Sequence, residues 1–338
     1  MTLDAVERIA EQFALAARVD AVERIERGLI NDSYLVTTSR GDYVVQRIND
    51  QVFRDPAVLA QNVAVVATHL GGTLVPEPVA TRAGGWLVTD GGAAWRAWHR
   101  VAGAAIPDAS PAQLRAAARL LGRFHAALAD LAPDQLVETL PRFHDPAHRL
   151  AGLIEAVEAD PVDRAEGMAA EIGAALAAAP LAARAAEIVA SVPRRVAHND
   201  AQLANFLFRG DDAVCLVDLD TVMGTAWFWD VGDLLRTSAA PAAEDDPDPE
   251  HNVAQPERVR AILAGYREGA GAALRRGSPE DDALEHAGAI VTYEQALRFL
   301  TDWILGDTYY RIDRADQNRD RARAQLARFA SLQDTVRS

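Results

Sequence analysis

The sequence predicts an α+β protein with two lobes, a small N-terminal lobe built on an antiparallel sheet and a larger, helical C-terminal lobe. Residues 20 to 50 contain short runs of β-branched and aromatic residues separated by turns, which is typical of strands. From Ser110 onward, apolar residues recur at helical spacing. The predicted lobes cover residues 1–98 and 99–338, with residues 99–103 as the connector between them.

The N-terminal lobe is expected to begin with an amphipathic helix in residues 1–15. The elements predicted after it follow from strand or helix periodicity; they are strands Val22–Ile25, Ser33–Thr37 and Asp42–Ile48, a helix from Pro56 to about Leu70, and strands Gly85–Thr89 and Trp95–Trp98. Asp55 ahead of a proline at the first helical position is typical of a helix start.

The C-terminal lobe is expected to begin with a helix at Ser110, a good N-cap that is followed by a proline. His125 lies beside the apolar stripe of this helix, and we interpret it as a packed structural histidine. The alanine-rich residues 160–190 predict two helices separated near Pro180. Further along the chain, the composition predicts an exposed loop over residues 238–257, a helix that includes Phe299 and Trp303, and a charged final helix over residues 314–328.

The stretch between residues 196 and 237 has the residue order of a kinase catalytic loop. His198 is followed by Asp200 and, five residues later, by Asn205; two short apolar runs and Asp218 come next. The two runs predict a hairpin over residues 206–217. Because a hairpin returns the chain to its starting end, Asn205 and Asp218 should lie close together.

These residue types suit the separate tasks of phosphoryl transfer. Magnesium prefers hard oxygen ligands, which Asn205 and Asp218 can supply. The acceptor hydroxyl needs a carboxylate that orients it and takes its proton, and Asp200 is placed for that role. An aspartate-rich loop is more often a solvated turn or a set of caps, but the ordered set favours the catalytic interpretation. Asp211 and Asp212 are interpreted as turn residues.

The overall composition restricts the class of protein. Apolar residues make up 49% of the 338, enough for a sizeable core, and no apolar run approaches the length of a membrane span. The net charge of −15 argues against a nucleic-acid partner; it reflects either solubility or attraction of a cationic substrate. The single cysteine, Cys215, excludes a disulfide framework. We therefore expect a cytoplasmic protein without a membrane partner, and the sequence does not predict its oligomeric state.

The chain contains no lysine, so its 34 basic residues are all arginines, and any phosphate contact that a lysine normally makes must here be made by an arginine. Arg47 interrupts an apolar strand where a kinase places its phosphate-pairing cation, although an edge-strand arginine facing water is the alternative. Gly28 and Asn31 lie in a turn that suits a phosphate-binding loop, but an ordinary hairpin turn fits at least as well. The helix after Asp55 lacks the glutamate that would pair with the cation, and Gln61 is the nearest candidate.

The chain resembles the aminoglycoside phosphotransferase and choline kinase superfamily, whose members share a bilobal protein-kinase-like fold, and within it the N-acetylhexosamine 1-kinases. The similarity covers most of the chain. The segments that carry it are Gly28–Tyr34, Tyr43–Asn49, Val52–Phe53 with Pro56, Trp95–Arg96, His198–Asp200, Val217–Met223, Asp230–Asp233, Leu297–Trp303, Gly306–Asp307 and Tyr309. Asn199, where many relatives have glycine, and the Asp-Leu-Asp-Thr run favour the hexosamine kinases.

The resemblance implies a role for each matching residue. Asp200 would be the base, Asn205 and Asp218 the magnesium ligands, and Asp220 a second metal ligand or a support for Asp218. The remaining roles are ATP-phosphate binding near Arg47, bracing of the catalytic loop by Asp230 with His198 in support, and a sugar pocket at Arg298 and Tyr309. A solvated arginine is the alternative for Arg298.

The resulting expectation is an ATP- and magnesium-dependent kinase that phosphorylates the anomeric hydroxyl of an N-acetylhexosamine, either N-acetylglucosamine or N-acetylgalactosamine. One alternative is a kinase for another acceptor, such as an aminoglycoside, another sugar or an amino alcohol. The other is a nucleotide-binding regulator without catalysis, which the missing helix glutamate and the missing lysine support.

Overall fold

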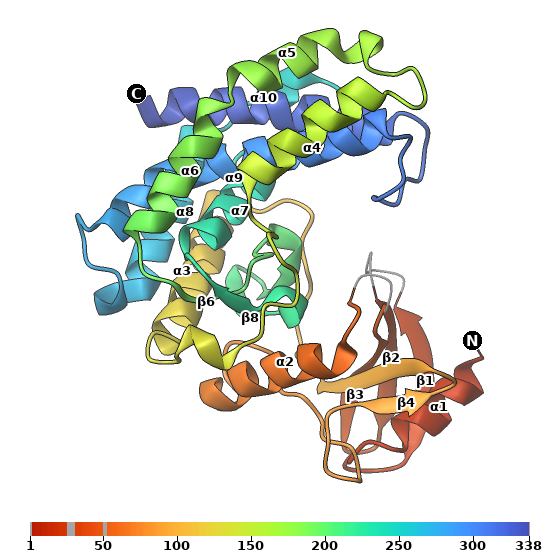
Figure 1. Cartoon of the computed structure of the whole chain (residues 1–338). Helices are drawn as coiled ribbons and strands as arrows, with labels where there is room; N and C mark the ends of the chain where they lie inside the picture. Colours follow the sequence, from red (N-terminus) through yellow and green to blue (C-terminus); the bar gives the residue numbers. More distant parts are fainter. Residues whose placement is uncertain (1, 26–30, 50–52, 338) are drawn as a thin grey trace.

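The computed structural model describes residues 2–25, 31–49 and 53–337, and it confirms the predicted fold class. Figure 1 shows a small sheet-based lobe that holds the N-terminus and a larger helical lobe that holds the C-terminus. The small lobe begins with the helix α1 (Leu3–Ala10). Its antiparallel sheet consists of β1 (Val19–Ile25), β2 (Asp32–Thr38), β3 (Gly41–Arg47), β4 (Val88–Asp90) and β5 (Ala93–His99). The five strands are ordered β1-β2-β3-β5-β4.

The two faces of this sheet have different neighbours because side chains alternate along each strand. One face is apolar and packs against α1, with Val45 and Trp95 in the same buried cluster as Ile9. The other face carries Gln46 and Arg96, which lie opposite each other in the pairing of β3 with β5. The sheet therefore has one face that packs against α1 and a second face that combines these polar groups with Val44 and Trp98, which pack against the core of the larger lobe.

The strand β4 is shorter than predicted and begins three residues later. Thr81 N–H donates to the carbonyl of Gly85 (2.7 Å), and Gly84 N–H donates back to the Thr81 carbonyl (3.0 Å). These hydrogen bonds fold residues 81–85 into a turn, so this backbone is not available for sheet pairing.

The helix α2 (Pro56–Leu70) has the predicted limits. The side chain of Asp55 caps its first turn, and Gly71 ends it in the left-handed conformation (φ 59°). Asn62 joins the helix to the larger lobe, because its side chain donates to the Val137 carbonyl (2.8 Å) and accepts from Val137 N–H (3.0 Å). The helix α2 therefore belongs to the junction between the lobes.

The larger lobe consists of helices packed around one long central helix, α9, which α4, α6, α7 and α10 contact. Its helices are α3 (Pro111–Ala127), α4 (Pro146–Ala159), α5 (Ala169–Ala177), α6 (Pro180–Ser191), α7 (Phe228–Ser238), α8 (Pro256–Ala270), α9 (Pro279–Ile304) and α10 (Gln317–Arg337). Two short antiparallel strand pairs lie near the lobe junction. They are β6 (Arg195–Ala197) with β9 (Met223–Thr225), and the hairpin of β7 (Phe206–Arg209) with β8 (Asp212–Leu216).

Most of the predicted elements of this lobe are confirmed. The capping box at Ser110 is present, and His125 is fully buried against α8 and α7. The final helix begins at Gln317, later than predicted, and continues to Arg337. One stretch, Glu166–Ser191, is long and apolar enough to cross a membrane by length and composition alone. It is divided between α5 and α6, and its composition alone is weak support for a membrane span.

Three glycines allow α3 and α8 to pack with their backbones in contact. A Cβ atom added to Gly265 or Gly269 of α8 would overlap the carbonyl oxygens of Arg115 and Arg119, and one added to Gly122 of α3 would overlap the backbone of α8. This pair of helices borders the catalytic segment, since α3 also packs against β8.

We predict that Gly265→Ala destabilises the protein by about 1–3 kcal/mol or more, because α8 must move away from a rigid carbonyl. Gly173→Ala is the matched control; no atom lies within 4 Å of a Cβ at this position in α5. It should stabilise the protein by roughly 0.5–1 kcal/mol through helix propensity. Urea denaturation measures both effects, and equal responses of the two variants would contradict this packing.

Candidate active site

The candidate catalytic loop connects β6 to the β7–β8 hairpin. The predicted hairpin is confirmed, with Phe206 paired to Leu216 and a turn at Gly210 (φ 59°). Val217 N–H donates to the carbonyl of Asn205 (2.9 Å), one residue before Asp218. The hairpin thus brings the backbones at Asn205 and Asp218 to the same end, as expected from the spacing.

His198 fastens the start of the loop to the end of β8. Its Nε2 lies 2.9 Å from the carbonyl of Val217, and its Nδ1 lies 3.3 Å from the N–H of Asp200. A carbonyl accepts and a backbone N–H donates, so these partners assign a neutral imidazole with the proton on Nε2. His198 therefore connects the backbone at Asp200 to the backbone at Val217, one residue before Asp218.

Asn199 adopts a left-handed backbone conformation (φ 67°), which glycine and asparagine tolerate better than other residues. Its side-chain amide donates to the carbonyls of Ala197 (3.2 Å) and Thr221 (2.9 Å). An asparagine is therefore well suited to this position of the loop. The side-chain hydrogen bonds also join the loop to the segment after Asp218.

Asp230, in the first turn of α7, is completely buried beneath the loop. Its carboxylate accepts hydrogen bonds from the N–H groups of His198 (2.7 Å) and Asn199 (2.6 Å) and from Nε2 of His125 (2.8 Å). Burial by itself would raise the pKa of Asp230, but the bond from His125 and the other donors hold it below its ordinary value. A buried anion with three donors thus fixes the backbone of the loop.

Asp200 projects from this loop and accepts hydrogen bonds on both carboxylate oxygens. Gln202 Nε2 lies 3.1 Å from each oxygen, and Asn205 Nδ2 lies 3.0 Å from Oδ2 and 2.7 Å from the Asp200 carbonyl. The half-buried carboxylate is therefore oriented by two side-chain amides that donate to its oxygens.

Asp218 follows β8 in a left-handed conformation (φ 66°), and its side chain is solvent-accessible. Desolvation by the surrounding protein, with the negative charges of Asp220 and Asp200, raises its pKa, while Arg96 acts in the opposite direction. A site with this excess of negative charge suits a cation.

The oxygens at this site fit a magnesium ion shared with a nucleotide. Because Asn205 uses its Nδ2 to hold Asp200, its Oδ1 is left for a cation, and no donor to Oδ1 is found in the described part of the chain. No group of three or more His, Cys, Asp or Glu side chains that could enclose a metal occurs among the described residues. This agrees with magnesium chemistry, in which one or two protein ligands and the substrate phosphates share the ion.

Asp220, two residues further on, is held by donors from the small lobe. Its carboxylate forms an ion pair with Arg96 of β5 and accepts from Asn31 Nδ2 (2.8 Å). Asn31, in turn, accepts from the N–H of Asn49 through its Oδ1 (3.0 Å). Magnesium ligation by Asp220 and nucleotide binding by Asn31 stay predictions, and Gly28 lies outside the described residues.

Arg47 is not close to these acids. It lies at the end of β3, its side chain is 44% exposed, and its Nη1 is 3.8 Å from Oδ2 of Asp32. The alternation of the strand puts Arg47 on the side of the sheet occupied by Val45, whereas Gln46 is on the side of Arg96. The arginine that the structure brings to the acid cluster is therefore Arg96, for which the sequence suggested no role. Gln61 has no described contact with Arg47 and instead lines a groove of about 800 Å³ beside α2.

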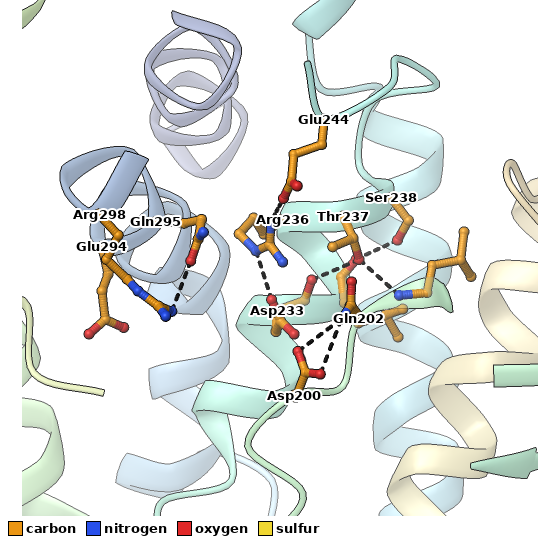
Figure 2. A network of polar contacts seen from close by, with 12 residues as sticks. Asp200, Gln202, Asp233, Arg236, Thr237, Ser238, Glu244, Glu294, Gln295 and Arg298 are labelled. Atoms are coloured by element: carbon orange, nitrogen blue, oxygen red, sulfur yellow. Dashed lines mark hydrogen bonds and ion pairs between the residues drawn. The ribbon is translucent and has the colours of Figure 1, made fainter. Parts of the chain in front are cut away.

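Side chains from α7 and α9 face each other above Asp200 (Figure 2). On α7, Asp233 forms a buried ion pair with Arg236 (2.7 Å). On α9, Arg298 donates to Gln295 (3.1 Å). The helix α9 is also connected to the catalytic loop, because Glu294 binds Nδ1 of His144 (2.9 Å), whose Nε2 lies 3.1 Å from the carbonyl of Asn199.

Arg298 lies among aromatic rings, with its guanidinium carbon 5.6 Å from the ring centre of Phe143, 5.9 Å from Tyr309 and 5.5 Å from Tyr310. The side chain of Tyr309 is 70% exposed. Asp302 orders this region by accepting from the N–H groups of Tyr309 (2.7 Å) and Tyr310 (2.9 Å). The predicted pocket residues Arg298 and Tyr309 are thus neighbours.

Sequence reasoning did not single out several residues that organise this site. Gln202 could have been found from its position inside the catalytic loop. His144, Glu294 and Asp302 gave no local signal, since each acts through partners that are distant in the sequence or on an irregular turn.

Comparison with known proteins gives a consistent result. Residues 21–279 match the model of the phosphotransferase enzyme family. Among solved structures, an aminoglycoside phosphotransferase from Alicyclobacillus acidocaldarius has 17% identity and a TM-score of 0.65, with 98% of this chain and 96% of that chain covered.

Two further structures contain a bound nucleotide or nucleotide analogue. Spectinomycin phosphotransferase APH(9)-Ia, in complex with ADP and spectinomycin, has 11% identity and a TM-score of 0.59, covering 97% of this chain and 98% of that one. Amicoumacin kinase hAmiN, in complex with AMP-PNP, Ca²⁺ and Ami, has 14% identity and a TM-score of 0.62, covering 99% and 94%.

The family match spans well over half of the chain, from β1 to the start of α9, and it includes the catalytic loop, the β7–β8 hairpin and Asp230. The residues of the predicted acceptor pocket, Arg298 and Tyr309, lie beyond it. On these grounds the chain belongs to the phosphotransferase enzyme family, whose members include aminoglycoside phosphotransferases.

Proposed function

We propose that this protein is an ATP- and magnesium-dependent kinase that phosphorylates the anomeric hydroxyl of an N-acetylhexosamine. The observation that carries the proposal is the position of Asp200. Its carboxylate is oriented by Gln202 and Asn205 and lies beside the facing side chains of α7 and α9, which include Arg298 (Figure 2). The candidate general base therefore lies below the polar side chains that α7 and α9 direct toward each other.

Asp200 would bind the acceptor hydroxyl and take its proton as the oxygen attacks the phosphoryl group. The anomeric hydroxyl of a sugar is more acidic than an ordinary alcohol, so a carboxylate is a sufficient base. Asn205 and Asp218 would hold the magnesium ion, which supplies neutralisation of the phosphate charge when bound. The rest of the acceleration would come from orientation of the hydroxyl by the fixed loop.

The surroundings of Arg298 support an acetamido sugar as the acceptor. A guanidinium group donates well to an amide carbonyl, and exposed aromatic rings such as Tyr309 can cover the apolar face of a pyranose. Gln295 and Tyr310 add a second polar edge through their mutual hydrogen bond (3.1 Å). This combination offers donors to the ring substituents together with an apolar contact surface.

A cationic acceptor such as an aminoglycoside is the second candidate, and acidic side chains near the site favour it. Asp233 lies on α7, Glu244 on the loop after it and Glu294 on α9, and the chain has a net charge of −15. However, Asp233 and Glu244 are neutralised by Arg236, and Glu294 by His144. A catalytically silent regulator is less consistent with a fully assembled Asp200, Asn205 and Asp218.

We predict that Asp200→Asn lowers kcat by roughly 10²–10⁴-fold, the usual contribution of a general base, while the Kd for ATP changes little. Steady-state assays and calorimetric ATP titration measure the two quantities. Asp211→Asn, in the exposed β7–β8 turn, is the matched control and should keep wild-type turnover. Near-wild-type turnover of Asp200→Asn would remove Asp200 from its catalytic role.

We also predict a specific order of acceptors. ADP release should be fastest with N-acetylglucosamine or N-acetylgalactosamine and slow with glucose, glucosamine, kanamycin and choline. Arg298→Gln should raise the KM for the preferred sugar by about 10- to 100-fold, which corresponds to one charged hydrogen bond. The Kd for ATP should stay constant.

The control for this variant is Arg323→Gln, which removes an ion pair on α10 outside the site. Faster turnover of kanamycin or choline than of either N-acetylhexosamine would contradict the sugar as acceptor and favour a cationic one. An unchanged KM in Arg298→Gln would remove the arginine from the pocket.

A further inference from the structure

A buried ion pair joins the small lobe to the segment that follows Asp218. It is formed by Arg96 of β5 and Asp220, whose side chains are 5% and 4% exposed. Replacing a buried pair of this kind by apolar residues is often neutral or stabilising, so stability alone is a weak reason for its presence. Its position two residues after a candidate metal ligand points to a role at the site.

The small lobe holds the guanidinium of Arg96 in a fixed orientation. Nε donates to Oε1 of Gln46 (3.0 Å), which also accepts from Trp98 Nε1 (2.8 Å). The guanidinium carbon lies 5.1 Å from the centre of the Trp98 ring. Gln46 itself donates to Ser33 (3.0 Å). A hydrogen-bond network across β2, β3 and β5 therefore orients the guanidinium of Arg96 toward Asp220.

Two of the three guanidinium nitrogens of Arg96 have partners in this network, Nε with Gln46 and Nη1 with Asp220. Over residues 2–25, 31–49 and 53–337, no protein acceptor is found for the third nitrogen, Nη2. An arginine has five N–H donors in a planar fork that matches phosphate oxygens. Arg96 therefore keeps donors available while it is paired with Asp220.

The chain contains no lysine, so the candidates for a phosphate-binding cation on the sheet are arginines. Arg47 is 44% exposed and lies on the opposite side of the sheet from Gln46. Arg96 is buried, is directed at the acids and lies beside Asp218, where the metal-bound phosphates would be.

We propose that Arg96 is the residue of the small lobe that binds the phosphates of the nucleotide, and that Asp220 holds its guanidinium in place beside Asp218. This inference rests on the proposed kinase function. In this proposal the phosphate-binding cation comes from β5. Asp220 and Gln46, which lies opposite Arg96 on β3, hold its guanidinium in position.

The test compares nucleotides that differ only in phosphate number, by calorimetric titration of ATP, ADP and adenosine in the presence of magnesium. The variant is Arg96→Gln with Asp220→Asn, which removes both buried charges together and keeps amide hydrogen-bonding groups at both positions. We expect a loss of about 10- to 100-fold in affinity for ATP, a smaller loss for ADP and no change for adenosine. Asp220→Asn alone retains Arg96 but loses the carboxylate that positions its guanidinium, so its loss of ATP affinity should be smaller than that of the double variant.

Two other arginines of the small lobe serve as comparisons. Arg100→Gln, which removes an exposed pair with Asp42, should bind all three ligands normally. The proposal is overturned if Arg47→Gln loses ATP affinity and the double variant does not. It is also overturned if the double variant loses affinity for adenosine as strongly as for ATP. A third contradicting result is that Asp220→Asn alone reproduces the whole loss of ATP affinity, because the ion pair would then serve only to connect the two lobes.

Failure of the kinase function gives a different result from failure of this assignment. A wild-type protein that binds ATP no more tightly than adenosine would contradict the proposed function. A wild-type protein whose affinity rises with phosphate number, together with an unchanged double variant, would contradict only the role of Arg96.

Discussion

The buried carboxylate of Asp230 is the interaction on which the candidate site depends. It accepts from the N–H groups of His198 and Asn199 and from the ring of His125, all inside a region without solvent access. A buried anion is stable only when its oxygens are satisfied by donors, so the loop backbone has little freedom to move without exposing an unpaired charge. The geometry of Asp200 therefore follows from a residue that is thirty positions away and does not face the acceptor.

The second constraint is the concentration of negative charge at the lobe junction. Asp200, Asp218 and Asp220 act on one another, and each is stabilised differently: by side-chain amides, by access to solvent and cations, and by Arg96. In the proposed function, Asp200 is the base, Asp218 a metal ligand and Asp220 the partner of the small lobe, all within one short segment. Positioning and electrostatics are the main contributions that a protein makes to phosphoryl transfer, so such a division suits the reaction.

The parts of the site that could be predicted from the sequence are those encoded locally. The catalytic loop and hairpin have fixed spacings, and the turn at Gly210 returns the chain so that Asn205 meets the residue before Asp218. The choice between Arg47 and Arg96 could not be predicted in the same way, because the face on which a strand residue lies reverses with each position and depends on register. The link from Glu294 through His144 to the loop joins elements far apart in the sequence, for which the local pattern has no signal.

The family match identifies phosphoryl transfer, whereas the residues that we propose for the acceptor pocket lie on α9 and the turn after it, beyond the matched residues. The most direct measurement of the central claim is therefore phosphorus NMR of the product formed by the wild-type protein from ATP and N-acetylglucosamine. The account predicts a sugar phosphate whose phosphorus is coupled to the anomeric proton. Coupling to the methylene protons of C6 or to another ring proton would contradict attack by the anomeric hydroxyl at Asp200.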